Sequence, residues 1–386
     1  MEPGYAGETP LKYIEPDSTT GTSKAVIVED LSLLHTTQIL AFDDGRQMVT
    51  GGISNQTERG LVVLRGVLST AGSDWESIAK LNIYISTSND MPVVRQLLAR
   101  EFSHPNKPAA TFVVTPLPDP SARIAMDAVA VPRLRSKASK VEWISPLGYY
   151  DREICSAAVA APGPLIYVSG MADTNQLPDA TRITLGKLMS AIGHLGLTKS
   201  DVVQLKAFFG PMSESAVVRK AIVDFFGGTA PPTVFVEWIS PAPGPPIEIE
   251  LIAAGKPNPT NGNDSVIFVT PPGTTSTKVF SRIAQVNHGK LIFISGLYGM
   301  NAQDPAGEVR EIFQSLGKIL QTTGSDFEHL VKATYYVSDD AAGNKLNDIR
   351  PEFFNPVRPP AASKAKVRGV GVPDKTVAVD MIAVTK

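Results

Sequence analysis

The chain has 386 residues, of which 43% are hydrophobic, so it is long enough for two or three domains that each bury a core. Its 36 basic and 38 acidic residues give a net charge of −2, and no long run of one sign occurs, which argues against a surface for nucleic acid or an anionic membrane. A single cysteine, Cys155, excludes an internal disulfide framework and a thiolate zinc site.

The first 22 residues are polar and contain no apolar segment typical of a signal peptide, so we expect an N-terminal tail at residues 1–22. No uninterrupted apolar stretch approaches ~18 residues, and no membrane span is predicted. These two features predict a soluble, cytoplasmic protein.

The next segment, residues 23–135, predicts a mixture of strands and helices. A weak strand at Met48–Gly52 precedes a helix that ends at Gly72, as expected of a C-terminal cap that needs a positive φ. A strand near 80–85, a second helix ending at Phe102 and an alternating strand at Ile124–Val131 follow. The first helix is indicated by apolar residues at helical spacing, namely Leu61, Leu64, Val67 and Leu68.

The same order returns twice along the chain. The turn glycines Gly72, Gly196 and Gly324 are 124 and 128 residues apart, and on these offsets the second helices end at Phe102, Phe226 and Phe354. The strands before the first helix and the closing strands also recur, at Leu165–Gly170, Leu291–Gly296, Ile247–Ala254 and Val377–Val384. A repeat of this period means that one structural unit occurs three times.

Each unit is therefore predicted to be β-β-β-α-β-α-β-β, and the fold class is α/β (more narrowly α+β). A basic connector follows the first repeat, and a turn-forming linker, Lys256–Asp264, follows the second. The predicted boundaries are a tail at 1–22 and repeats at 23–135, 141–256 and 265–386.

Several of these features occur together in one known family. They are Ser-Gly after an apolar strand, the glycine turn, the strand Val331–Val337, Glu-Phe-Phe at 352–354, Pro-Pro-Ala at 359–361 and the strand Ile247–Glu250. In this order and spacing the chain resembles the YjgF/RidA family, also labelled endoribonuclease L-PSP. The resemblance implies a chorismate-mutase-like fold and a homotrimer with a central barrel of sheets, outer helices and three clefts between subunits. Here one chain would replace that homotrimer as an intramolecular pseudo-trimer, since a sheet covered by helices on one face needs partners on the other.

The resemblance also implies an activity, the hydrolysis of small reactive enamines and imines with release of ammonia. In such members an arginine after the Pro-Ala pair binds the substrate carboxylate with two parallel hydrogen bonds. This sequence has Ala110, Thr233 and Ala362 at that position. Lys364 lies two residues beyond Ala362, from where it would attract an anion without forming a two-pronged clamp.

A glutamate on the last strand is the other implied catalytic group, thought to position or activate the hydrolytic water. Glu248 matches it in the second repeat, whereas Ala125 and Ala378 stand in the other two. The second acidic position of that strand is kept as Asp127, Glu250 and Asp380, for which a surface-facing or structurally paired role is the plain interpretation.

The strand-end pairs are implied to line the clefts. They are Ser169-Gly170 and Ser295-Gly296, with Gly51-Gly52 assigned to the first repeat. The aromatic residue expected earlier in each repeat is not visible, because Gln38, Ser156 and Arg282 occupy the rough equivalents. We therefore expect Glu248 as the catalytic residue, and Ser169, Gly170, Thr233, Ser295, Gly296 and Lys364 as substrate-binding residues.

Two classes of function follow. The first is a hydrolytic deaminase with degenerate clefts, and the alternative is a non-catalytic or regulatory protein that binds a small metabolite between repeats. A weaker alternative, an endoribonuclease or translation inhibitor, depends on the family label alone, and no nucleic-acid partner is expected. No cofactor and no metal site are predicted, because the five histidines show no metal-ligand spacing.

Overall fold

The computed structural model of the chain describes residues 10–29, 32–133, 141–145, 151–240, 243–256, 264–300 and 304–386. Most of the predicted connector and linker lies outside the described residues. No helix in the described part of the chain is both long and apolar enough to cross a membrane.

The three repeats each contain two helices and a series of strands. The first consists of β1 (Leu11–Asp17), β2 (Thr22–Val28), β3 (Leu33–Thr36), β4 (Ile39–Leu40), α1 (Gly52–Thr70), β5 (Ile78–Ile85), α2 (Met91–Glu101), β6 (Ala109–Val114) and β7 (Ile124–Ala130). The second consists of β8 (Glu142–Ile144), β9 (Ala157–Ala160), β10 (Leu165–Asp173), α3 (Leu177–Gly193), β11 (Val202–Phe209), α4 (Ser215–Phe226), β12 (Thr233–Glu237) and β13 (Ile247–Ala254). The third consists of β14 (Val266–Val269), β15 (Ile283–Val286), β16 (Leu291–Ile294), α5 (Pro305–Thr322), β17 (Leu330–Val337), α6 (Asp340–Ile349), β18 (Ala361–Lys366), β19 (Gly369–Val370) and β20 (Val377–Val384).

The repeat predicted from the turn glycines is confirmed in the backbone. Gly72, Gly196 and Gly324 follow α1, α3 and α5 with φ values of 72°, 70° and 77°. Only glycine adopts this left-handed conformation without a steric cost, so the three turns share one geometry. The order β-β-β-α-β-α-β-β is likewise present in each repeat, with short additions such as β4 and β19.

The sheets do not follow the repeat boundaries, because each repeat lends its first two strands to a different repeat. Strand β9 pairs with β3, β15 pairs with β10, and β2 pairs with β16. Three six-stranded arrays result, in the orders β6-β5-β7-β3-β9-β8, β12-β11-β13-β10-β15-β14 and β18-β17-β20-β16-β2-β1. We call them unit 1 (33–160), unit 2 (165–286) and unit 3 (291–384 together with 11–28).

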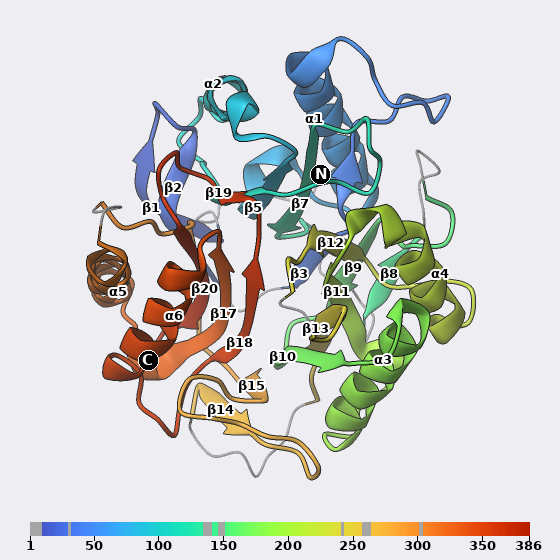
Figure 1. Cartoon of the computed structure of the whole chain (residues 1–386). Helices are drawn as coiled ribbons and strands as arrows, with labels where there is room; N and C mark the ends of the chain where they lie inside the picture. Colours follow the sequence, from blue (N-terminus) through green and yellow to red (C-terminus); the bar gives the residue numbers. More distant parts are fainter. Residues whose placement is uncertain are drawn as a thin grey trace, which may run out of the picture.

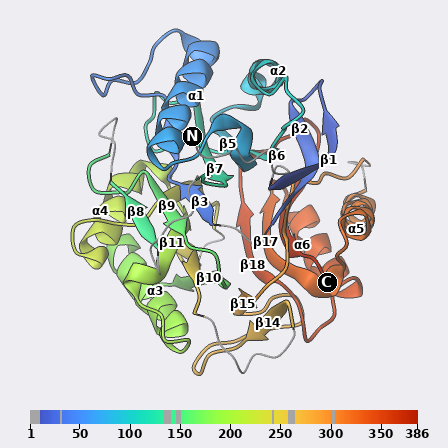
Figure 2. The ribbon, with the colours of Figure 1, turned by 180° about the vertical axis from the view of Figure 1, so that it is seen from behind.

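This exchange is visible in the ribbon. Strands β1 and β2 lie beside the C-terminal unit, away from α1 of their own repeat (Figures 1 and 2). Ile14, Ala25 and Ile27 accordingly belong to the hydrophobic core of unit 3. The predicted tail at 1–22 is wrong for residues 11–17, because β1 pairs along its length with β2 and buries Leu11 and Ile14.

The third strand of the first repeat also differs from the prediction. Residues 48–52 do not form a strand, since Gly51 and Gly52 introduce α1 with positive φ. The counterpart of β10 and β16 is β3 with β4, whose end carries Thr37-Gln38 where the other repeats have Ser-Gly. Residues 41–51 separate this strand from α1, and because of this longer connection the equivalence of β3 and β4 with β10 and β16 was not recognised in the sequence.

The units surround a common core, and their helices lie on the outside (Figure 1). Each sheet packs its outer face against its own helices in a separate cluster of buried apolar side chains. The inner faces of all three sheets contribute to two further apolar clusters. The units meet at three seams, where single backbone pairings join Ser23 with Ala109, Ile154 with Ala230, and Ser281 with Ala361.

Candidate functional site

Glu248 lies on β13 at the seam between units 2 and 3. Its side chain packs directly over the backbone of Gly170, where a Cβ atom would lie 2.0 Å from Glu248 Oε1. Gly170 sits at a β-bulge between Val168 and Met171 of β10, where the register of pairing with β13 shifts. A glycine is therefore needed here because it leaves room for the carboxylate.

Unit 3 completes the surroundings of Glu248 through strand β18. The Ser363 hydroxyl hydrogen-bonds with the Glu248 carboxylate and accepts a 3.1 Å hydrogen bond from the Gly170 N–H. Beside it, the Ser169 hydroxyl accepts from the Ala362 N–H at 2.6 Å and donates to the Ser281 carbonyl at 2.6 Å. Serine side chains of both units thus fix the seam around the carboxylate.

Two cations reach this seam from positions other than the family's arginine position. The Arg282 guanidinium, 8% exposed, donates to the Gly170 carbonyl at 2.8 Å and lies 5.1 Å from the Phe280 ring centre, while its Nε has no hydrogen-bond partner. Lys364 on β18 donates to Asn347 at 3.2 Å, and the charge of Glu248 acts on it. Ala362, at the implied arginine position, has no charged side chain, but Arg282, just before β15, places an arginine near Glu248.

Burial raises the pKa of the Glu248 carboxyl to about 7, and the neighbouring Glu250 acts in the same direction. Lys332, Ser363 and Arg282 oppose this shift. A carboxyl whose pKa is near neutral exchanges protons readily at physiological pH, as general acid–base catalysis requires. Among the predicted residues, Glu248 therefore has the most reactive surroundings.

At the equivalent seam between units 1 and 2, a side chain fills the space that Gly170 leaves open beside Glu248. Gln38 stands at the position of Gly170, and its amide both donates to and accepts from the backbone of Phe235, at 3.1 and 3.3 Å. Thr37, at the position of Ser169, bonds to the backbone of Thr233 through its hydroxyl. The assignments of Gly51-Gly52 as the strand-end pair, and of Gln38 as an aromatic equivalent, are therefore wrong.

The seam between units 3 and 1 keeps Ser295-Gly296 but has no glutamate. The Ser295 hydroxyl accepts from the Ala110 N–H at 2.7 Å, repeating the Ser169 arrangement. The hydroxyl of Tyr298 would lie 3.1 Å from a Cβ on Gly296, so the tyrosine occupies space near this glycine. Arg95 stacks on Phe112 beside it, at 4.3 Å from the ring centre.

The predicted site residues are thus divided among three seams. Ser169, Gly170, Glu248 and Lys364 come together between units 2 and 3, whereas Thr233 lies in one of the other seams and Ser295 with Gly296 in the other. Sequence reasoning missed Ser363 and Arg282 as site residues. Ser363 could have been found only from the meeting of β18 with unit 2 at the seam, and Arg282 only from the strand exchange, because it directly precedes β15, which pairs with β10.

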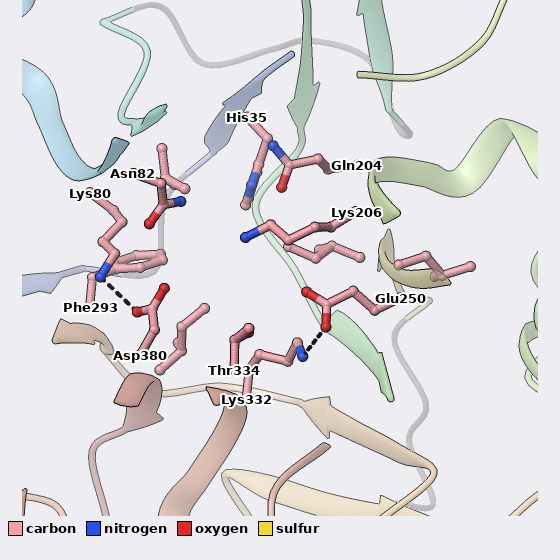
Figure 3. Close-up of a pocket in the computed structure, with 14 residues that line it drawn as sticks. His35, Lys80, Asn82, Gln204, Lys206, Glu250, Phe293, Lys332, Thr334 and Asp380 are labelled. Carbon is pink, nitrogen blue, oxygen red and sulfur yellow. Dashed lines mark hydrogen bonds and ion pairs between the residues drawn. The ribbon is translucent and has the colours of Figure 1, made fainter. Parts of the chain in front are cut away.

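The second acidic position has a different environment. Glu250 and Asp380 point into the centre of the molecule, where they form ion pairs with Lys332 and Lys80 (Figure 3). Asp127 is more deeply buried, at 1% exposure, and accepts hydrogen bonds from Asn82 and Tyr84. They are structurally paired. The described residues contain no group of three or more His, Cys, Asp and Glu side chains placed to hold a metal ion.

The protein is thus one of repeated α/β units in which a carboxylate lies against a bulged glycine at a seam between units. Comparison with known proteins gives its family. Residues 15–132 and 274–385 match the endoribonuclease L-PSP family. The chain therefore belongs to this family, which the sequence resemblance had indicated.

Individual relatives align with about a third of the chain or less. The 2-iminobutanoate/2-iminopropanoate deaminase of Rattus norvegicus is 31% identical over 117 residues, 30% of this chain and 83% of the rat protein. The protein of the same name from Dermatophagoides farinae is 27% identical over 85 residues, 22% of this chain and 66% of the mite protein. Among solved structures, the Rid-family protein YyfB of Yersinia pestis is 21% identical with a TM-score of 0.30, covering 32% of this chain and 99% of that chain.

Proposed function

We propose that this protein is a hydrolytic deaminase of small enamines or imines, with its active site at the seam that contains Glu248. The observation that carries the proposal is the Glu248 carboxyl, which is held against Gly170 and has a pKa of about 7. The relatives named as iminobutanoate/iminopropanoate deaminases support the same chemistry.

The reaction adds water across the C=N bond of an imine, to which an enamine first tautomerises, and then releases ammonia, leaving a carbonyl product. Ionised Glu248 takes a proton from the attacking water as its oxygen bonds to the carbon, and the resulting carboxylic acid returns that proton to the nitrogen. As the C–N bond then breaks and the C=O bond forms, the hydroxyl proton passes through the same carboxylate to the departing nitrogen, which leaves as ammonia. A pKa near 7 suits both steps, because neither protonation state is strongly disfavoured. Arg282 and Lys364 supply the positive charge that would hold an anionic substrate group.

The test is ammonia release from an enzymatically generated 2-aminoacrylate, measured with the wild type, Glu248→Gln and Glu58→Gln. We expect the Glu248 variant to lose at least about a hundredfold in rate, as removal of a general base does, and the exposed Glu58 variant to retain activity. Arg282→Met should raise KM more than it lowers kcat if Arg282 binds the substrate. Wild-type rates equal to buffer across several imines would contradict the proposal.

A second candidate is metabolite binding without catalysis, favoured by a cavity at a different seam. A cavity of about 220 Å³ that is open to solvent lies between units 1 and 2 and is lined in part by Leu40, Phe42, Arg219 and Phe235. A mostly apolar wall with a few polar groups is typical of small-molecule sites. A thermal-shift screen with Phe235→Ala as control would test this alternative, since a ligand in this cavity should lose its effect in that variant.

We also propose that the three units act together as an intramolecular trimer, in place of three separate chains. The exchanged strands and the three seams support this. Sedimentation equilibrium should then give a particle of 41.2 kDa. A stable trimer of chains would contradict it.

A further inference from the structure

A second polar site lies at the centre of the molecule. A cavity of about 50 Å³ is lined by inward-facing side chains of equivalent strands from all three units (Figure 3). On each strand two successive inward positions are polar and stand between apolar ones, as in Val331, Lys332, Thr334 and Tyr336 of β17. The polar layer therefore separates the two apolar clusters of the common core.

Two ion pairs around this cavity join neighbouring units in the same way, from the lysine of one unit to the acidic residue of the next. Lys80 of unit 1 pairs with Asp380 of unit 3 at 2.7 Å, and Lys332 of unit 3 pairs with Glu250 of unit 2. The third pair of the cycle would join position 204 of unit 2 to Asp127 of unit 1. That position is a glutamine, whose amide donates instead to the Thr36 carbonyl at 2.7 Å.

The third lysine stands two residues further along the strand, at Lys206. It is only 8% exposed, has no hydrogen-bond partner among the described residues, and directs its ammonium group into the cavity (Figure 3). Burial opposes the charge, but Tyr336 and the carboxylates Asp127, Glu250 and Asp380 outweigh it and raise the pKa of the Lys206 amine. Lys206 is therefore a buried cation without a direct counterion.

A second donor faces the same space. His35 is fully buried, and neither ring nitrogen has a hydrogen-bond partner. Burial lowers the pKa of His35 to about 4, with Lys206 acting in the same direction, so the neutral ring offers one N–H at pH 7. Buried polar groups without partners are costly, so a ligand that accepts from both would be stabilised.

We propose that this cavity binds a small anion in the size range from chloride to formate, held by the Lys206 ammonium with the His35 ring N–H as a second donor. The size follows from the volume, because one water needs about 10–15 Å³ of such space and a larger metabolite would not fit. The charge follows from the geometry, because Glu250 and Asp380 each form an ion pair with another lysine, and no ion pair involves Lys206 among the described residues. Asp127 is held by Asn82 and Tyr84, and burial raises the pKa of its carboxyl.

The decisive test is a crystal of the wild type grown with bromide in place of chloride. The expected result is an anomalous peak within hydrogen-bond distance of Lys206 Nζ. A map that shows ordered water only at this position would overturn the proposal, whatever the behaviour of any variant.

A measurement in solution tests the same proposal. The thermal midpoint of the wild type should rise and saturate with sodium chloride but not with sodium gluconate, whose anion is too large for the cavity. Lys206→Met should lose this difference, with at least about a tenfold loss of apparent chloride affinity, whereas the exposed Lys220→Met should keep it. A Lys206→Met protein that folds and still responds to chloride would contradict the assignment.

Discussion

Glu248 combines two properties that oppose each other, a position suited to chemistry and an environment that disfavours its charge. Burial raises the pKa of this carboxyl from 4.5 to about 7. The folded protein therefore holds a proton on this group between about pH 4.5 and 7 that the unfolded chain has released, and the free energy of unfolding falls as the pH rises through that range. Above about pH 7 the folded protein bears the whole free-energy cost of burying the ionised carboxylate.

Glu248→Gln should accordingly be more stable than the wild type at pH 8, by about 1–3 kcal/mol, and equal to it near pH 4.5. The amide keeps a similar shape while removing the buried charge. Urea denaturation at both pH values measures the difference. A variant that becomes less stable relative to the wild type as the pH rises would mean that the carboxylate is well solvated or fully paired.

Gly170 provides a second test of the same contact. Gly170→Ala would place a methyl group on the Glu248 side chain, so we expect loss of activity and a destabilisation of about 1–3 kcal/mol. The double variant Gly170→Ala with Glu248→Ala should recover most of the stability, because the clash is gone. Gly296→Ala is the matched control, since its new methyl group would lie 3.1 Å from a tyrosine hydroxyl and needs only a small movement. Equal effects of both glycine substitutions would exclude the contact as the cause.

At the scale of elements, periodicity was sufficient to locate the helices and the closing strands, although α6 ends at Ile349 and not at the predicted Phe354. The strands predicted at Ile247–Ala254 and Val377–Val384 have these bounds as β13 and β20, and the first helices end two or three residues before the predicted glycines. The partner of each strand was not predictable in the same way. The last four residues of β2, Ala25–Val28, are all apolar and could be buried in any of the three sheets, so the pairing of β2 with β16 is decided by the arrangement of whole repeats.

The same limit applies to the candidate site. Glu248, Ser169 and Gly170 could be identified because each lies in a recognisable local pattern. Arg282 could not, because its place beside Gly170 depends on β15 joining β10 across a repeat boundary. The third strand of the first repeat was missed because Thr37-Gln38 replaces the Ser-Gly pattern that marks its equivalents.

The exchanged strand pair makes a prediction of its own. Deleting residues 1–28 removes β1 and β2, leaves the edge of β16 unpaired and takes three apolar side chains out of the core of unit 3. Hydrogen exchange should then accelerate in β16 and α5, and much less in β11 and α3 of unit 2. Deleting only residues 1–9, which precede β1, is the control and should leave β16 protected. Uniform acceleration in all units would show instead that the three units unfold as one.

In the whole molecule, the polar layer joins the units through charges. Lys332 and Glu250 are 5% and 6% exposed and belong to different units. Such a pair contributes little by itself, since desolvation offsets much of the attraction, but one member left alone is strongly destabilising. The layer therefore favours one assembly of the units over others.

Lys332→Met should cost about 3–5 kcal/mol because it leaves Glu250 buried without its partner. Lys332→Met combined with Glu250→Met should restore most of that loss. Guanidinium denaturation of the wild type and the three variants gives the coupling between the two residues. Additive losses in the double variant would mean that the two side chains contribute independently.

The exchange of β1 and β2 has a consequence for synthesis on the ribosome. The partner strand β16 is made on the order of 260 residues after β2, which at about 5–20 residues per second is a delay of roughly 13–50 s. During that time the apolar face of β2 has no permanent partner, whereas unit 2 is continuous in sequence and can close as soon as it emerges. Strands β1 and β2 are thus enclosed only after β16 has been made, although they precede it in the chain.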